Sequence, residues 1–225
     1  MKIDENLPVI KENIKRACEK CARDVNDVTI LAVTKTMDAQ NINRAIELGL
    51  VNIGENRVQE LLEKYDLVDK RAVWHIIGHL QKNKVKYIAD KVSMIHSVES
   101  FELAKEIDKQ CKKFGRVMDI LVEVNVSGEE SKSGISPDEA IDFVREISVF
   151  ENIRVKGLMT MAPLEASEEE LHEIFSGLYK ISVDISREKL DNVTMECLSM
   201  GMSNDYITAI EENSTIVRLG RCLFR

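Results

Sequence analysis

The chain has 225 residues and a formal net charge of −8 at pH 7, with 44% hydrophobic and 31% charged residues, which is ordinary for a globular protein with a buried core. The acidic balance and the absence of a long basic block give no support for a nucleic-acid partner. The first twenty residues mix acids with bases, and no apolar run approaches the roughly 18 residues of a membrane span. We therefore expect a cytoplasmic protein with no membrane partner.

Short β-rich runs alternate with helix-compatible stretches along almost the whole chain. An amphipathic helix over residues 5–22 comes first, with apolar positions at Leu7, Ile10 and Ile14. Eight predicted strands follow, at residues 28–34, 51–54, 73–77, 92–98, 117–126, 153–160, 193–199 and 215–219. Seven predicted helices lie between them, at about 39–49, 56–66, 81–90, 100–114, 136–149, 167–190 and 204–212.

Eight alternating β and α units are typical of a closed (β/α)8 TIM barrel. An open doubly wound sheet is the alternative, although such a sheet rarely needs eight equal repeats. Only three prolines occur, and no linker rich in Pro, Gly or Ser divides the chain. We therefore expect an α/β fold in which residues 1–225 form a single barrel domain with an extra N-terminal helix. Such barrels place their ligands at the carboxyl ends of the strands.

A lysine ends the first predicted strand, within the run "LAVTKT" at residues 31–36. Burying an ammonium group costs several kcal/mol unless the group is paired or neutralised. Lys35 is therefore either the first exposed residue after the strand or an amine with a chemical use. Desolvation and neighbouring cations at the barrel mouth would free its lone pair for reaction with an aldehyde.

The ends of the last two predicted strands carry residues typical of an anion site. The runs "SMGMSND" (199–205) and "RLGR" (218–221) supply hydroxyls, glycines that allow backbone N–H groups to approach an anion, and fixed positive charge. Ser203 is expected to cap the helix that follows. Taken singly, the residues of either loop are those that an ordinary turn or helix cap needs. Barrels, however, often bind phosphate with the loops after strands seven and eight together. The candidates are Ser199, Gly201, Ser203, Arg218, Gly220 and Arg221.

A phosphate site beside a strand-end amine suits pyridoxal 5′-phosphate (PLP), which needs an anion cradle and a lysine that forms a Schiff base with its aldehyde. A Schiff-base aldolase acting on a sugar phosphate fits these residues nearly as well. No metal site is expected, because the C-x-x-C of Cys18 and Cys21 falls in a helical stretch without a second ligand pair. The odd number of cysteines, five, argues against a disulfide framework.

Several long motifs occur in an order typical of one family. They are "LAVTKT", "IGENRVQE" (53–60), "WHIIGHLQKNKVK" (74–86), "IHSVES" (95–100), "EVNVSGEESKSGI" (123–135), "GLMTM" (157–161), "LSMGMSNDYITAI" (198–210) and "STIVRLGR" (214–221). With them the sequence resembles the YggS/PROSC family of PLP homeostasis proteins over essentially its whole length. The resemblance implies a barrel like the N-terminal domain of alanine racemase, and a protein that binds and regulates or delivers PLP without established catalysis.

The resemblance also implies a role for each candidate residue. Lys35 would form the Schiff base, Asn56 would lie beside the ring, and Arg218 would face the pyridine nitrogen. The phosphate would be held by Ser199, Gly201 and the backbone around Gly220 and Arg221, although the family more often has threonine where Arg221 stands. Lys132, in the loop after the fifth predicted strand, would either guide PLP at the mouth or be an ordinary loop lysine.

The nature of the site bears on whether the chain is an enzyme. An arginine that faces the pyridine nitrogen keeps its protons, so the ring nitrogen stays unprotonated and the ring is a weaker electron sink. Racemases of the related fold imply a second acid/base group, a tyrosine from a separate domain, and no such domain is expected here. His75 and His96 are potential substitutes, although strand histidines are more often core residues.

We therefore expect an intracellular PLP carrier or regulator with no catalytic residue assigned. The alternative is a small fold-type III PLP enzyme, such as a weak amino-acid racemase, and a PLP-independent aldolase comes third. The expected partner is PLP itself, and PLP-dependent apoenzymes are candidate recipients of the PLP that the protein carries. Because no second domain is expected to share a site between subunits, a monomer is the default.

Overall fold

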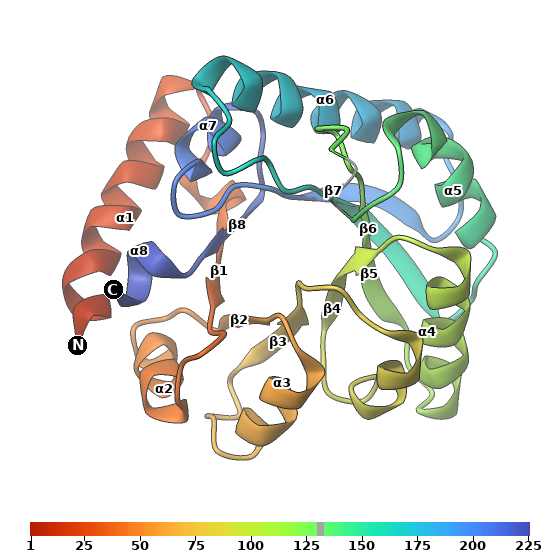
Figure 1. The fold of residues 1–225 in the computed structure, drawn as a ribbon, viewed down its shortest axis with the longest axis horizontal. Coiled ribbons are helices and arrows are strands. Elements are labelled where there is room, and N and C mark those ends of the chain that lie inside the picture. The colour runs from red at the N-terminus through yellow and green to blue at the C-terminus, as the bar shows by residue number, and fades with distance from the viewer. Residues whose placement is uncertain (130–132) are drawn as a thin grey trace.

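Eight parallel strands close into a barrel in the computed structural model, which describes residues 1–129 and 133–225. Each strand pairs with the next, and β8 pairs with β1, so the sheet has no free edge (Figure 1). This topology confirms the predicted (β/α)8 fold, and each strand lies within its predicted run except the second, which ends one residue later, at Glu55. The strands are β1 Thr29–Val33, β2 Asn52–Glu55, β3 Val73–Ile76, β4 Met94–Val98, β5 Met118–Glu123, β6 Ile153–Met159, β7 Val193–Ser199 and β8 Ile216–Leu219.

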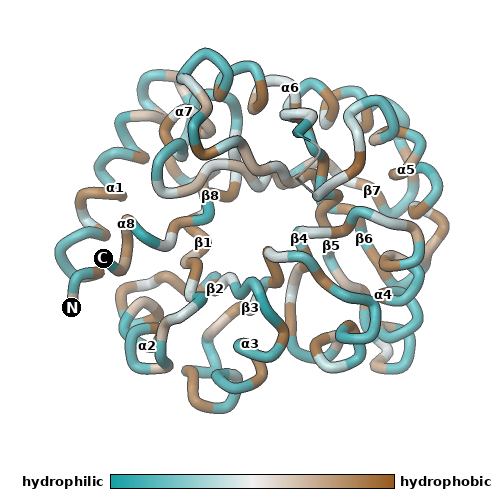
Figure 2. The backbone as a smooth tube through the Cα atoms, in the orientation of Figure 1, coloured by the Kyte–Doolittle hydropathy of each residue, from teal (hydrophilic) through white to brown (hydrophobic). Residues whose placement is uncertain are grey.

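An outer layer of helices surrounds the strands (Figure 1). Polar and apolar residues alternate along these helices, as expected for elements with one face on the barrel and one in water (Figure 2). The α-helices are α1 Lys2–Lys20, α2 Ala39–Glu47, α3 Val58–Tyr65, α4 Phe101–Lys113, α5 Ala140–Ile147, α6 Glu168–Arg187, α7 Tyr206–Glu211 and α8 Arg221–Phe224. Three short 3₁₀ helices are η1 Val25–Asp27, η2 Lys82–Tyr87 and η3 Pro137–Glu139.

Two helical stretches differ from their predictions. The stretch at 81–90 forms only the 3₁₀ helix η2, whose lysines alternate with Asn83, Val85 and Tyr87. Val85 in η2 and Ile88 directly after it are buried at a spacing of three, which matches the three-residue turn of a 3₁₀ helix better than an α-helical stripe. Pro137 begins the 3₁₀ turn η3, and the α-helical part starts at Ala140.

The extra N-terminal helix supports the far end of the chain. Helix α1 packs against α7 and α8, so that the two termini lie close together (Figure 1). The side-chain amide of Asn6 donates to the Leu223 and Arg225 carbonyls, each at 3.1 Å. Asn13 donates to the hydroxyl of Tyr206 at 3.1 Å. Because α7 and α8 follow β7 and β8, helix α1 fixes the two loops in which the sequence predicts an anion site.

Two apolar clusters make up the core. The larger one lies between strands and helices, and a smaller one fills the barrel interior with Leu31, Ile77, Met94, Leu121, Met159 and Ile216. Among the residues that the structure describes, no helix has both the length and the apolar character needed to cross a membrane.

Candidate functional site

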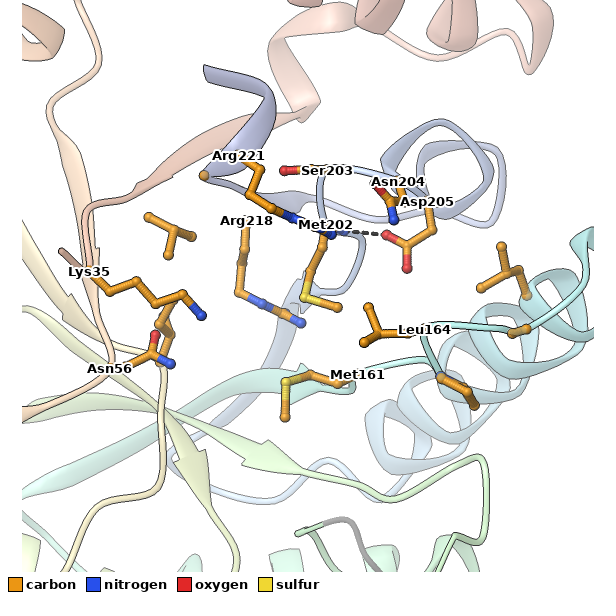
Figure 3. A pocket seen from close by; sticks show the side chains of 16 residues that line it. Lys35, Asn56, Met161, Leu164, Met202, Ser203, Asn204, Asp205, Arg218 and Arg221 are labelled. Atoms are coloured by element: carbon orange, nitrogen blue, oxygen red, sulfur yellow. Dashed lines mark hydrogen bonds between the residues drawn. The ribbon is translucent and has the colours of Figure 1, made fainter. Parts of the chain in front are cut away.

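A cavity of about 400 Å³ lies at the carboxyl ends of the strands (Figure 3). Its volume falls within the range of small-molecule sites. Six of the eight predicted cofactor-binding residues line it: Lys35, Asn56, Ser203, Arg218, Gly220 and Arg221. Ser199 and Gly201 are fully buried residues outside its lining. The far wall is apolar and comes from the loop between β6 and α6, where Met161 and Leu164 stand opposite Lys35 (Figure 3).

The cavity gathers positive charge in an acidic chain. Among the described residues, Lys35, Arg218 and Arg221 line it against one carboxylate, that of Asp205, although the whole chain carries a net charge of −8. One oxygen of that carboxylate accepts the backbone N–H of Met202, which keeps it within its own loop. Fixed cations on a concave, partly apolar surface favour an anionic ligand, above all a phosphate.

Lys35 occupies a tight turn that begins directly after β1. The Met37 N–H donates to the Thr34 carbonyl at 2.9 Å, which closes the turn around Lys35 and Thr36. The Lys35 side chain is exposed and projects into the cavity close to Asn56 (Figure 3). Lys35 is thus both the first exposed residue after the strand and part of the cavity wall, so its amine is open to a ligand.

Arg218 lies on the cavity floor with only 4% of its surface exposed. One of its terminal nitrogens donates to the Ser199 carbonyl at 2.6 Å and to the Ser199 hydroxyl at 2.7 Å, and the other donates to the Thr160 carbonyl at 2.8 Å. Burial lowers the pKa of Arg218 to about 10, so the side chain stays charged at neutral pH. These bonds use three of the five guanidinium N–H groups, which leaves two for a ligand.

A buried chain of hydrogen bonds continues from Arg218 through the barrel. The rings of His96 and His75 lie within bonding distance of Ser199 Oγ (2.9 Å) and of each other (3.0 Å), and His75 reaches Asn52 Oδ1 at 3.3 Å. Burial lowers the pKa of His75 to about 4 and that of His96 well below its usual value, so both rings are neutral. The two histidines therefore act as paired core residues, the interpretation that the sequence favoured.

That chain also fixes the direction of each hydrogen bond. The amide oxygen of Asn52 only accepts, so His75 donates to it through Nε2 and accepts from His96 through Nδ1. The Ser199 hydroxyl in turn donates to His96 Nδ1, and the oxygen of that hydroxyl accepts an N–H of Arg218. The carbonyl and hydroxyl oxygens of Ser199 both accept from Arg218 and so orient it, while the hydroxyl also bonds His96. The structure does not bring this hydroxyl to the cavity surface.

The two predicted anion loops meet at Ser203. The prediction that Ser203 caps the last helix is wrong, because α7 starts at Tyr206 with Asp205 as its N-cap residue. The Ser203 hydroxyl accepts the backbone N–H of Cys222 at 3.2 Å, and so ties the β7 loop to α8. Gly201 has a φ of 92°, and a Cβ there would lie 2.6 Å from that of Ala209, so the tight turn needs glycine.

Glu123, at the end of β5, is a buried acid that the sequence analysis missed. It is only 3% exposed, and burial raises its pKa to about 7, with the neighbouring Glu99 carboxylate adding to the rise and Arg218 opposing it. The signal for such a residue was present, since a glutamate ends the apolar run "ILVEV" (120–124). Its charge near Arg218 changes at a physiological pH.

Glu123→Gln is expected to change how stability depends on pH. The ordinary pKa of a glutamate is near 4.5, so between pH 4.5 and 7 the folded protein binds a proton that the unfolded chain has lost. The contribution of Glu123 to wild-type stability therefore falls as pH rises through this window, by about 3 kcal/mol. Glutamine cannot titrate, so the variant should gain stability over wild type between pH 5 and pH 8. The histidines contribute equally to both proteins and cancel in the difference.

The measurement is urea unfolding of both proteins at pH 5 and pH 8. Parallel changes in wild type and variant would show that Glu123 titrates normally.

The fold and the site together define a class of protein. The family model "Alanine racemase, N-terminal domain" matches residues 6–225, so the chain belongs to that family of barrels. An alanine racemase from Clostridium difficile shares the fold at a TM-score of 0.79 and 18% identity, covering 99% of this chain and 56% of its own.

The curated relatives place the chain more closely. A pyridoxal phosphate homeostasis protein from Aquifex aeolicus is 42% identical over 98% of this chain and 96% of its own length. PipY from Synechococcus elongatus, solved with PLP bound, has a TM-score of 0.81 and 28% identity, covering 95% of this chain and all of its own. The chain is a member of the pyridoxal phosphate homeostasis (YggS/PROSC) family.

Proposed function

We propose that this chain binds PLP in the cavity at the strand ends and acts in PLP homeostasis as a carrier or regulator, with residues 1–225 forming its single binding domain. The observation that carries this proposal is the cationic cavity with the exposed amine of Lys35 at its edge. Fixed cations suit the phosphate of PLP, and a reachable amine suits its aldehyde. The PLP bound to the relative PipY supports the same assignment.

Each wall of the cavity has a role in this proposal. The Lys35 amine bonds the PLP aldehyde carbon as a Schiff base, with loss of water. Arg218 would face the pyridine nitrogen with its two spare N–H groups, and Asn56 would lie beside the ring. Arg221 and the backbone at Gly220 hold the phosphate, next to the loop that Ser203 ties in place. Bound PLP supplies an electron sink for amino-acid chemistry, and Arg218 keeps that sink weak.

The lining of the cavity favours a carrier over a racemase. A racemase needs a proton donor within about 3 Å of the substrate Cα on the face opposite the lysine. Among the described residues, no tyrosine, histidine or cysteine lines the cavity, and the wall facing Lys35 is apolar. Tyr206, the tyrosine nearest a strand end, bonds Asn13 of α1 instead. The loop residue Lys132 lies outside the described residues.

Transfer and turnover assays separate the two functions. We expect the protein to act in the cytoplasm as a monomer. When loaded with PLP, it should restore activity to an apo-aminotransferase. The same sample mixed with L-alanine in D₂O should exchange the Cα proton no faster than free PLP does. Reactivation without exchange is the expected result. Exchange well above the free-PLP rate would favour a weak racemase, and failure to reactivate the apoenzyme would count against a carrier.

A further inference from the structure

The turn that carries Lys35 is strained. Thr36 has a φ of 67°, in the left-handed region that β-branched residues avoid. A turn with a positive φ at its third position normally has glycine or asparagine there. A threonine in this place persists only if surrounding contacts hold the turn in one conformation. The strain directly follows the residue that faces the cavity.

Three charged side chains hold the turn from the side of β2 and α3. Lys64 donates to the Thr34 carbonyl at 3.0 Å, the same oxygen that closes the turn, and pairs with Glu55 at 2.9 Å. The same Glu55 oxygen accepts the Thr34 hydroxyl at 2.7 Å. Glu60 accepts the backbone N–H of Thr36 at 3.4 Å. Glu60 and Lys64 are four residues apart, so one face of α3 supplies both contacts.

The pair at the centre of these contacts is buried. Glu55 is fully buried and Lys64 is 12% exposed, and the second carboxylate oxygen of Glu55 has no hydrogen-bond partner among the described residues. Burial raises the pKa of Glu55, against the hydrogen bonds from Lys64 and Thr34. Buried ion pairs contribute little to stability compared with apolar residues of the same size, so stability alone does not account for this one.

We propose that Glu55, Glu60 and Lys64 form a clamp that holds the Lys35 turn in its strained conformation and so presents the Lys35 amine to the cavity. These are positioning residues, and their effect on the ligand passes through the turn. Because the clamp already orders Lys35 in the free protein, less conformational entropy is lost when PLP binds. This inference rests on the proposed function.

Lys64→Met tests the clamp by ligand affinity. If the competent turn falls to about a tenth of the population, the apparent Kd for PLP rises about tenfold. Thr36→Gly removes the strain, because glycine adopts a positive φ freely, so adding it to Lys64→Met should restore the Kd to within about threefold of wild type. Lys70→Met is the matched control, since Lys70 is 75% exposed and contacts Asp66 at 3.4 Å and the Tyr65 ring, 5.3 Å from its centroid, but not the turn. It should leave the Kd unchanged.

Amide exchange tests the same clamp without PLP. The Met37 N–H is protected by its bond to the Thr34 carbonyl, so it should exchange faster in Lys64→Met and at the wild-type rate in Lys70→Met. Circular dichroism confirms that each variant is folded. Wild-type exchange at Met37 together with a wild-type Kd in Lys64→Met would overturn the clamp, as would a loss of affinity that Thr36→Gly does not rescue. If wild type itself fails to bind PLP, the proposed function fails, while Met37 exchange still decides on the clamp.

Discussion

Gly157→Ala is expected to destabilise the protein by about 4 kcal/mol or more, a loss that few single substitutions reach. Gly157 pairs with Cys197 where β6 lies against β7. A Cβ at this position would lie 1.7 Å from the Cys197 carbonyl oxygen and 2.7 Å from its carbonyl carbon. Both are backbone atoms, which cannot rotate away as a side chain can. The barrel would have to open between these strands.

Gly177→Ala, in helix α6, provides the matched control for this prediction. Its added Cβ would meet only the tip of the Val126 side chain, at 3.1 Å. Alanine also has the better helix propensity, by about 1 kcal/mol, so the net change should be small. Urea unfolding of both variants measures the difference. A loss below about 1 kcal/mol in Gly157→Ala would mean that β6 and β7 can move apart at little cost.

Lys35→Ala is expected to weaken PLP binding by about a hundredfold or more, because the covalent link is lost and only the phosphate and ring contacts stay. The fold should be unaffected, since Lys35 is exposed and its backbone, not its side chain, forms the turn. Equilibrium dialysis against PLP gives the Kd, and thermal unfolding without ligand checks the fold.

Lys180→Ala serves as the control for Lys35→Ala, because Lys180 is exposed on α6 and lies outside the cavity. It should bind PLP as wild type does. Equal affinity in Lys35→Ala and Lys180→Ala would show that the amine of Lys35 does not hold the ligand.

The fold could be predicted because its signals are local and repeat eight times. Each strand is a short β-rich run followed by a helical stretch, and the closed barrel is the arrangement that such repeats favour. The place of Lys35, Arg218 and Gly220 at one end of the barrel followed from the direction of parallel strands alone. Individual elements with a weak apolar pattern, such as the segment at 81–90, could not be assigned to the right helix type.

The orientation of single side chains could not be predicted in the same way. Ser199 and Ser203 are both hydroxyls of one loop motif, yet one supports Arg218 inside the barrel and the other binds the backbone of α8. That difference depends on the reach of Arg218 from the neighbouring strand and on the close packing of α8, neither of which leaves a local signal. The same holds for Lys64, whose role depends on a turn thirty residues earlier in the chain.

Reduction of the wild-type protein with borohydride in the presence of PLP, followed by peptide mapping, shows whether Lys35 forms the Schiff base with PLP. We expect a yellow protein in which reduction fixes one PLP per chain on the peptide that contains Lys35. A colourless protein, or label spread over the exposed lysines, would contradict it and return Lys35 to the status of a residue that merely ends a strand.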